Sequence, residues 1–226
     1  MAGTVIITGA TGYLGHAFVE RFLASCPEYT LVATVRATSK NKPGTAKLNR
    51  IISKHPNAKI QLEQVDLSRL DSVRSFTTRI AAAVSAGTLP RISALICNAF
   101  AWSLNGQKST PDGLEESFQV SHLSHYLMVL RLLGSMNADS GRVVMLGSVA
   151  HDKKNPNPLS KLRAEFPADI EHLVKPPLDL PGEEHDRGFQ RYGTSKLANV
   201  TFMMDLNKRL QAVSGNTLFA PTIFLY

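Results

Sequence analysis

The stretch Thr4-Val-Ile-Ile-Thr8-Gly9-Ala-Thr-Gly12-Tyr-Leu-Gly15 decides the fold of this chain. A short apolar, β-branched run leads directly into three glycines, and apolar residues at helical spacing follow them. A strand, a glycine-rich turn and a helix in this order are typical of a dinucleotide-binding unit. Gly9 would permit the tight turn, Gly12 would let the backbone approach a pyrophosphate, and Gly15 would let the helix pack on the strand. Free N–H groups at the start of the helix would then face the phosphates.

Apolar segments of strand length alternate with helical periodicity along most of the remaining chain. The predicted strands are 4–8, 30–35, 59–65, 92–97 and 142–147, and the predicted helices are 13–25, 44–54, 69–86, 112–137 and 190–213. This alternation predicts an α/β fold, a doubly wound parallel sheet (Rossmann fold) with helices on both faces. With 226 residues and 43% apolar composition, we expect 1–226 to form a single domain. A long, proline-rich insertion is predicted at about 149–189.

The stretch Tyr192-Gly-Thr-Ser-Lys196 sets a phenol and an ammonium four residues apart on the last predicted helix, where they share one face. An unperturbed tyrosine titrates near pH 10 and is a poor proton relay at neutral pH. A positive charge at about 4 Å, at an effective dielectric of about 20, favours the phenolate by about 4 kcal/mol, or roughly three pKa units. The phenol would then suit general acid/base work. An isolated pair of this kind is more often a surface pair, so the interpretation depends on the glycine-rich turn that precedes it.

The net charge of +7 is spread along the chain, and no basic tract interleaved with aromatic residues occurs, which argues against a nucleic-acid partner. Arg36 ends the second predicted strand, lysines follow it, and no acidic residue occurs between Glu28 and Glu63. An NAD site usually carries an acidic residue there for the ribose 2′-OH, whereas arginine suits a 2′-phosphate. The sequence therefore predicts NADP over NAD.

The two cysteines, Cys26 and Cys97, have no spacing typical of a metal site or a disulfide framework, which predicts a reducing compartment and no bound metal. No leader segment is visible, and no apolar run approaches the roughly 20 residues that span a bilayer. We expect a soluble, cytoplasmic protein with a small-molecule partner, no membrane span and no nucleic acid, and a homo-oligomer is left open.

Further motifs fall in the same order along the chain and together resemble the short-chain dehydrogenase/reductase superfamily. They are Asp66-Leu67, Asn98-Ala99 and Gly147-Ser148 after the third, fourth and fifth predicted strands, followed by Tyr192 and Lys196. The resemblance implies an NADP-dependent oxidoreductase that interconverts a carbonyl and an alcohol, with ketone reduction as the expected direction. The implied catalytic residues are Ser148, Tyr192 and Lys196. The implied cofactor contacts are Thr8, Gly9, Thr11, Gly12, Tyr13, Leu14, Gly15, Arg36, Asp66, Leu67, Asn98, Ala99, Tyr192 and Lys196.

The resemblance also implies a role for each active-site residue. Tyr192 would protonate the nascent alkoxide, and Ser148 would donate a hydrogen bond to the substrate oxygen. Lys196 would lower the pKa of the phenol and hold the nicotinamide ribose. Asn98 would serve the architecture beside the cofactor, and Trp102 would belong to the core or the pocket wall.

Three departures from the family pattern leave alternatives open. The Gly-x-x-Gly-x-x-Gly spacing is that of extended members, which are sugar epimerases and dehydratases, and Ser121 stands where relatives carry a catalytic asparagine. The chain ends at Tyr226, where relatives continue, so we expect the last strands to be missing after a strand-like tail at 217–225. The alternatives are therefore an extended-type epimerase or dehydratase, and a truncated relative without catalytic activity.

The insertion is anchored at both ends by active-site residues, so it is predicted to form a wall or lid over the substrate pocket, with a partly helical stretch at 159–174. Members that resemble retinol dehydrogenases and protochlorophyllide reductases also lengthen this region and accept bulky apolar substrates. A medium-sized or bulky organic substrate is therefore expected.

Periodicity also predicts which helix faces point inward. The predicted core stripes are Leu123, Leu127 and Leu130 in one helix and Leu197, Val200 and Met204 in another. His122 and His125 are interpreted as packing or surface residues, because no third metal-ligating residue recurs near them at ligand spacing.

Overall fold

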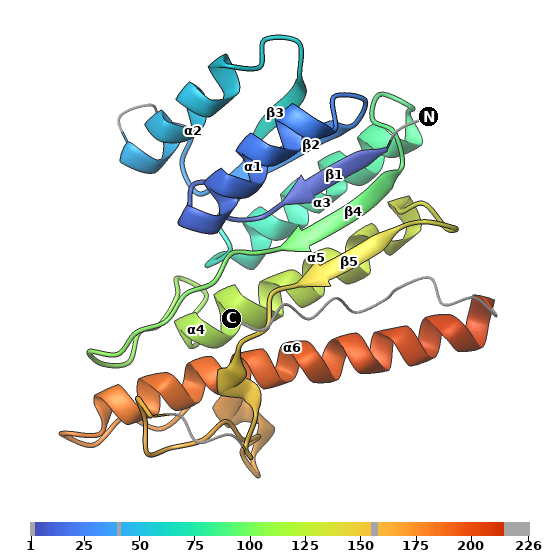
Figure 1. Ribbon diagram of the computed structural model, residues 1–226. Helices are drawn as coiled ribbons and strands as arrows, with labels where there is room; N and C mark the ends of the chain where they lie inside the picture. The colour runs from blue at the N-terminus through green and yellow to red at the C-terminus, as the bar shows by residue number, and fades with distance from the viewer. Residues whose placement is uncertain (1–2, 40–41, 155–157, 215–226) are drawn as a thin grey trace.

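A parallel sheet lies at the centre of the computed structural model, which describes residues 3–39, 42–154 and 158–214 (Figure 1). Its strands are β1 (Thr4–Ile7), β2 (Thr30–Val35), β3 (Lys59–Gln64), β4 (Ile92–Cys97) and β5 (Arg142–Met145). They lie in the order β3-β2-β1-β4-β5, and each neighbouring pair is parallel. The chain passes from one side of β1 to the other between β3 and β4, which is the switch point of a doubly wound sheet. The predicted fold class is confirmed, and the predicted tail strand at 217–225 lies outside the described residues.

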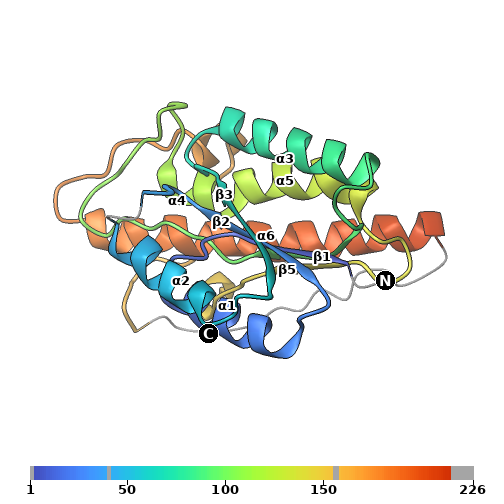
Figure 2. The ribbon, with the colours of Figure 1, turned by 90° about the horizontal axis from the view of Figure 1, so that it is seen from above.

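Helices cover both faces of the sheet (Figure 2). The longer helices are α1 (Tyr13–Ser25), α2 (Pro43–Ser53), α3 (Leu70–Ser85), α5 (Ser124–Leu132) and α6 (Glu184–Ser214). Short helical segments are α4 (Glu116–Phe118), the π-helical η1 (Gln119–Leu123), and the 3-10 turns η2 (Leu133–Ser135), η3 (Val149–His151) and η4 (Ile170–Leu173). Helices α1 and α2 lie on one face and α3 and α5 on the other, while α6 runs along the β5 side in contact with α4 and η1.

The strand residues alternate between two hydrophobic cores. In β1, Val5 and Ile7 pack with the buried residues of α1 and α2, whereas Ile6 packs with those of α3 and α5. In β2, Leu31 belongs to the first core and Val32 to the second. Successive side chains of a strand point to opposite faces, and here both faces are covered. This explains why the inner strands β1, β2 and β4 read as largely apolar runs. The edge strand β3 instead alternates apolar and polar residues.

Two glycines shape the turn between β1 and α1. Gly9 has φ of +67°, in the left-handed region that glycine enters without steric cost. Gly15 packs so closely on the turn that a Cβ there would lie 2.4 Å from the Gly9 carbonyl oxygen and 2.8 Å from Ala10 Cα. The conformational role predicted for Gly9 and the packing role predicted for Gly15 are confirmed.

The predicted core stripes are correct only in part. Leu127 packs against the core, but polar residues share the inward faces of both helices. In η1 and α5 the buried residues recur at helical spacing and include polar ones: Ser121, Ser124, His125, Met128, Val129 and Leu132. Leu130, by contrast, is exposed. In α6 the inward residues are Ser195, Lys196, Asn199, Met203 and Leu206, and Met204 is exposed. A search for apolar spacing alone cannot find a face that also carries the polar groups of a site.

The insertion is shorter than predicted, since α6 begins at Glu184, and it runs from 149 to 183. Within 159–174 the only helical segment is the 3-10 turn η4. The insertion wraps around the N-terminal part of α6 (Figure 1). Hydrogen bonds fasten it to two helices: Glu165 N–H donates to Thr194 Oγ1 of α6 at 3.2 Å, and Glu115 N–H at the start of α4 donates to the Val174 carbonyl at 2.7 Å.

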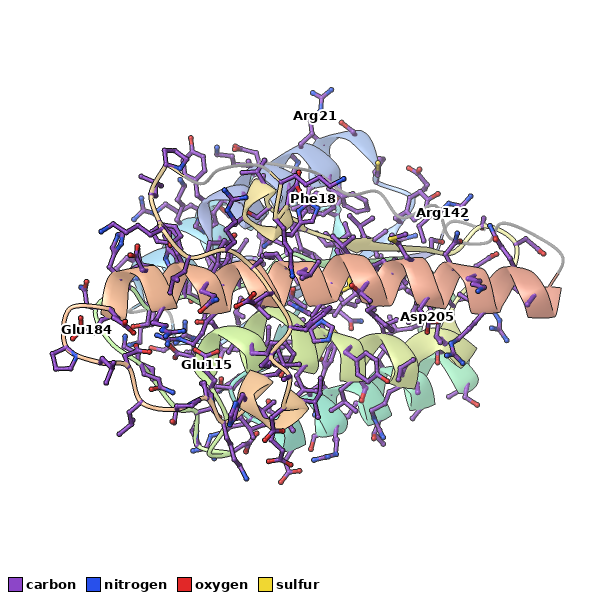
Figure 3. The ribbon with its side chains drawn as sticks, turned by 90° about the horizontal axis from the view of Figure 1, so that it is seen from below. Phe18, Arg21, Glu115, Arg142, Glu184 and Asp205 are labelled. Atoms are coloured by element: carbon purple, nitrogen blue, oxygen red, sulfur yellow. The ribbon has the colours of Figure 1, made fainter. Side chains whose placement is uncertain are left out.

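A buried ion network joins this insertion to the helices. Arg191 of α6 donates from Nη2 to Asp179 Oδ2 of the insertion at 2.9 Å, and its Nε lies 3.5 Å from Glu115 Oε1. Glu115 lies at the start of α4 next to α6 (Figure 3). The exposed fractions of the three side chains are only 11%, 6% and 1% for Arg191, Asp179 and Glu115. Burial raises the pKa of Glu115, against the effect of the Phe118 N–H that the carboxylate accepts.

None of the described helices has both the length and the apolar character needed to cross a membrane.

Replacing Arg191 by methionine should destabilise the protein strongly, because it leaves two buried carboxylates without their cation. The expected loss is about 3–5 kcal/mol in the free energy of unfolding at neutral pH. Urea titration followed by circular dichroism measures it. Arg187→Met is the matched control, since Arg187 lies one turn earlier and pairs with Glu183 at the exposed surface. It should change stability by at most about 1 kcal/mol, and equal effects of the two substitutions would contradict the network.

Candidate active site

The predicted site residues meet where the parallel strands end. Gly9 follows β1, Asn98 follows β4 and Ser148 follows β5. Helix α6 passes this region and contributes Tyr192 and Lys196. Binding sites in open α/β sheets lie at this carboxyl edge, next to the switch point of the strand order.

A pocket of about 530 Å³ opens over the glycine-rich turn and the ends of β2 and β4. Its lining contains these predicted cofactor contacts: Gly9, Thr11, Gly12, Tyr13, Leu14, Gly15, Arg36, Asp66, Leu67, Asn98 and Ala99. It also contains residues that the sequence analysis did not name: Thr34, Val35, Val65, Ser68, Phe100, Ala101, Glu116 and Val120. The structure thus brings most of the predicted contacts together. Thr8, Tyr192 and Lys196 are absent from this lining.

Thr8 is part of the interior and not of the pocket wall, which corrects its interpretation as a cofactor contact. It is fully buried, and its hydroxyl accepts from the N–H groups of Asn98 and Ala99 at 2.9 and 3.0 Å. The same oxygen lies 2.9 Å from His125 Nε2. Asn98 Nδ2 in turn donates to the carbonyls of Thr8 and Gly9 at 2.8 and 3.3 Å. Asn98 therefore holds the glycine-rich turn in place, the architectural role expected of it.

The carboxylate of Asp66 is hydrogen-bonded within its own loop. Its Oδ1 accepts from the Ser68 N–H at 3.0 Å and from the Ser68 hydroxyl at 2.7 Å, and Arg69 Nε lies 3.9 Å from its Oδ2. These bonds fix the turn after β3, so that this turn forms one wall of the pocket.

Tyr192 is half-buried, and its phenol is hydrogen-bonded with the Ser148 side chain. Burial raises the pKa of the phenol, and the bond with Ser148 acts in the opposite direction. The expectation that Lys196 brings this pKa down is wrong for this arrangement. The ammonium lies 5.6 Å from the centroid of the Tyr192 ring and donates to the Leu146 carbonyl at 2.9 Å instead.

Lys196 is one of the most deeply buried charged groups, with an exposed fraction of 2%. Burial lowers the pKa of its ammonium to about 8. Besides Leu146, the ammonium faces the ring of Phe100, 5.6 Å from its centroid. Cys97, also buried, has its pKa raised by burial to about 12, so its thiol stays neutral beside the ammonium.

Ser121, which stands where relatives carry an asparagine, is buried in the π-helical segment η1. Its hydroxyl donates to the Ala101 carbonyl at 3.1 Å and lies 3.2 Å from the Ala101 N–H. Its carbonyl accepts from Asn199 Nδ2 at 3.1 Å. The side chain thus holds the loop after β4, and the carbonyl is bonded to α6.

Aromatic rings surround the phenol of Tyr192. The ring centroids of Phe100 and Trp102 lie 5.9 and 5.4 Å from that of Tyr192, and Phe189 lies 5.5 Å from Trp102. The sequence predicts Trp102 in the core or the pocket wall, whereas none of the sequence motifs includes Phe100 or Phe189. Phe100 directly follows the Asn98-Ala99 motif, and Phe189 lies three residues before Tyr192, so both spacings could have indicated them.

A second cavity of about 460 Å³ lies between the insertion and α6. The α6 residues that line it are Arg187, Gln190, Arg191 and Thr194, whereas Ser148, Tyr192 and Lys196 are not in its lining. The prediction that the insertion forms a lid over the predicted catalytic residues is therefore not confirmed, because it encloses space on another face of α6.

The two histidines of the helix after β4 are packing residues, as predicted. His122 Nδ1 lies 2.8 Å from Asn199 Oδ1, and His125 is buried against Thr8. Burial lowers the pKa of His125 to about 3, so its ring is neutral. Among the described residues, no group of three or more His, Cys, Asp or Glu side chains is arranged to hold a metal ion.

Comparison with known proteins gives a consistent family assignment. The family model described as short chain dehydrogenase matches residues 3–159. A short-chain dehydrogenase of Talaromyces variabilis is 33% identical over 92% of this chain. The alignment covers 65% of that relative, and the chain spans about half to two thirds of the length of the curated relatives that it matches.

Solved structures agree on the fold. A metagenomic short-chain oxidoreductase in complex with NADP superposes with a TM-score of 0.67 at 18% identity, over 99% of this chain and 81% of that one. The bulky-bulky ketone specific alcohol dehydrogenase of Comamonas testosteroni gives a TM-score of 0.66 at 18% identity, over 99% and 71% of the two chains.

Lys196→Met should stabilise the protein, measured without nucleotide, at neutral pH. The pKa of about 8 in the folded chain lies below the ordinary value of 10.5, so the unfolded chain binds more protons between these values. The cost of burying the ammonium is thus fully present below pH 8 and falls as the pH rises towards 10.5. We expect a gain of about 1–3 kcal/mol in unfolding free energy at pH 7, shrinking above pH 8.

Lys208→Met is the control for this substitution, because Lys208 is exposed on the same helix. Lys208→Met should change the unfolding free energy by at most about 0.5 kcal/mol, both at pH 7 and above pH 8. Loss of stability in Lys196→Met at pH 7 would show that the ammonium stabilises the unliganded fold.

Proposed function

The chain belongs to the short-chain dehydrogenase/reductase family of oxidoreductases, and from this membership we propose that it is an NADP-dependent enzyme that interconverts a carbonyl and an alcohol. One observation carries the proposal: the Tyr192 phenol, bonded with Ser148 and next to Lys196, lies beside the pocket that the glycine-rich turn lines. Phe100 connects the two, since it lines the pocket and contacts Tyr192. Reduction of a ketone is the proposed direction.

The protein backbone around the pocket has a shape that fits a dinucleotide. Helix α1 has no side-chain cap and no acidic residue in its first turn, so its N-terminal N–H groups are left for an anion. At Gly12 a Cβ would come within 3.3 Å of the Gly9 carbonyl oxygen, so a side chain there would narrow the cradle. These features support a pyrophosphate at this point.

Arg36 supports the choice of NADP. It is exposed at the end of β2 and lines the pocket, where its guanidinium can pair with a 2′-phosphate. The acidic residues of the lining are Asp66 and Glu116, which belong to other segments, and the Asp66 carboxylate is engaged by Ser68. The metagenomic oxidoreductase with the same fold is in complex with NADP, which agrees with this choice.

When bound, the nicotinamide supplies the hydride. The raised pKa of Tyr192 keeps its phenol protonated at neutral pH, and this proton can pass to the alkoxide that forms on the substrate. Ser148, bonded with the phenol, can share the same oxygen by donating a hydrogen bond. We assign Lys196 to the nicotinamide ribose, with its orientation set by the Leu146 carbonyl.

The substrate is proposed to be a medium-sized or bulky ketone. The aromatic surroundings of Tyr192 support this, and the Comamonas neighbour is specific for bulky ketones. A sugar epimerase or dehydratase has only the glycine spacing in its favour, because the rings around the phenol offer few partners for sugar hydroxyls.

Arg36→Asp should weaken NADPH binding far more than NADH binding, because it replaces the phosphate partner by a repelling charge. Loss of a charged hydrogen bond predicts an increase of about 10- to 100-fold in the Kd for NADPH. Fluorescence titration of both nucleotides measures it. Arg50→Asp, the same change on the exposed end of α2, should leave both Kd values unchanged within about threefold. Equal losses of affinity for NADPH and NADH would contradict the assignment of Arg36 to the 2′-phosphate.

Tyr192→Phe should lower kcat for ketone reduction by about 10²- to 10⁴-fold, since it removes the proton donor. The Kd for NADPH should change little, because the ring remains. Tyr126→Phe is the control: Tyr126 is exposed on α5 and packs against Phe202. Retention of most of the activity in Tyr192→Phe would rule out this tyrosine as the donor.

A further inference from the structure

Three aromatic side chains form a continuous platform beside Tyr192, here called the aromatic shelf: Phe100, Trp102 and Phe189. Phe100 and Trp102 come from the loop after β4, and Phe189 comes from α6. The centroids of Phe100 and Trp102 are 6.4 Å apart, and Trp102 meets Phe189 edge to face at 5.5 Å. Trp102 also lies 5.4 Å from the Tyr192 ring, so the shelf and the phenol form one cluster.

Much of the shelf is open to solvent. The exposed fractions are 53% for Phe100 and 46% for Trp102, whereas Phe189 is buried and anchors the cluster. Large aromatic surfaces gain free energy on burial, and a contiguous apolar group of them beside reacting atoms marks a ligand site. Their faces and edges are the complementary surfaces for another ring.

The loop that carries the shelf is held in place at three points. A Cβ at Gly188 would come within 2.2 Å of the Ser103 carbonyl oxygen, so glycine allows the loop to lie against α6. Ser103 Oγ donates to the Gly106 carbonyl at 2.6 Å, and the Ser121 hydroxyl is bonded to the Ala101 backbone between the two rings. A platform ordered before binding loses little conformational entropy when a ligand arrives.

The position of the shelf relates it to the chemistry. Phe100 lines the cofactor pocket and touches Tyr192, so the rings of Phe100 and Trp102 are within reach of a substrate whose oxygen meets the phenol. One charged neighbour of the shelf, Lys196, is buried and bonded to the Leu146 carbonyl, and the His185 ring lies 5.1 Å from that of Phe189. The indole N–H of Trp102 is the hydrogen-bond donor that the three rings offer. A ligand rich in hydroxyl or charged groups would therefore lose more hydrogen bonds to water here than the rings replace.

We propose that the aromatic shelf binds an aromatic ring of the substrate, so that the preferred substrates are aryl ketones and the corresponding aryl alcohols. This inference rests on the proposed function and adds to it the class of substrate. Trp102 is then the residue that distinguishes an aromatic ring from a saturated ring of the same size. Ring-to-ring contact beyond burial corresponds to roughly a three- to tenfold preference.

Kinetics with two ketones of similar size test the shelf: acetophenone and cyclohexyl methyl ketone, each with NADPH. Since the two differ in intrinsic reactivity, the informative quantity is the change in their kcat/KM ratio between variants. Trp102→Ala should lower kcat/KM for acetophenone about three- to tenfold and change that for the saturated ketone less than about twofold. Trp102→Phe should retain part of the preference for acetophenone, measured as the ratio of the two kcat/KM values, because a ring remains. Phe166→Ala, which removes an exposed ring of the insertion, should leave the ratio unchanged.

A binding measurement separates this inference from the proposed function. Trp102 is the single tryptophan of the sequence, so the intrinsic emission excited at its absorption edge reports on the shelf without any turnover. Titration with 1-phenylethanol should change this emission saturably, and 1-cyclohexylethanol should need about three- to tenfold higher concentrations.

The outcomes are distinct. Turnover of both ketones with the same ratio in Trp102→Ala, or equal emission titrations by the two alcohols, would overturn the shelf as an aryl site and leave the proposed function intact. No NADPH oxidation with either ketone, together with a saturable response to 1-phenylethanol alone, would overturn the reductase proposal and support ring binding at the shelf.

Discussion

At the end of β1 a buried hydroxyl ties together the segments from which the site is built. Thr8 Oγ1 accepts from the backbone N–H groups of Asn98 and Ala99 and is bonded to His125 Nε2. Because the pKa of His125 is lowered to about 3, the ring is neutral, and its partners assign the tautomer: Nε2 accepts from Thr8 and Nδ1–H donates to the Ser121 carbonyl. The glycine-rich turn, the loop after β4 and the π-helical segment are therefore set relative to one another by a chain of buried hydrogen bonds. The pocket over the glycine-rich turn and the aromatic shelf both lie on segments that this network holds.

Neighbouring residues of helix α6 face two different sides of the helix. Tyr192 and Lys196 face the pocket side, while Arg191 faces the insertion and is neutralised by Asp179 and Glu115. Burying a charge costs free energy unless a partner and hydrogen bonds offset it. Arg191 has two carboxylates, whereas the partners of the Lys196 ammonium are the Leu146 carbonyl and the rings of Phe100 and Tyr192. The charge with neutral partners is thus the one assigned to the chemistry, and the charge with carboxylate partners is the one that holds the insertion.

The two sides of α6 also border different spaces. The insertion closes a cavity on the side of Arg187 and Arg191, and the loop after β4 builds the aromatic shelf on the side of Tyr192. The proposed substrate contacts thus belong to the short loop that Gly188 allows to approach the helix, and not to the long insertion.

The sequence by itself determined the fold class, the order of strands and helices along the chain, and many of the residues that line the pocket over the glycine-rich turn. These features follow from local signals: apolar runs, helical periodicity, and glycines such as Gly9 and Gly15 whose backbone positions exclude a side chain. The tertiary structure alone decided the burial of Thr8, the direction of the Tyr192 pKa shift, the polar inward face of α6 and the partners of Arg191. Each of these depends on atoms far apart in the chain, because the cost of burying a charge or a phenol is set by everything packed around it and not by its neighbours in sequence. The aromatic shelf belongs to the same class, since Trp102 and Phe189 meet only after the loop and α6 have packed together.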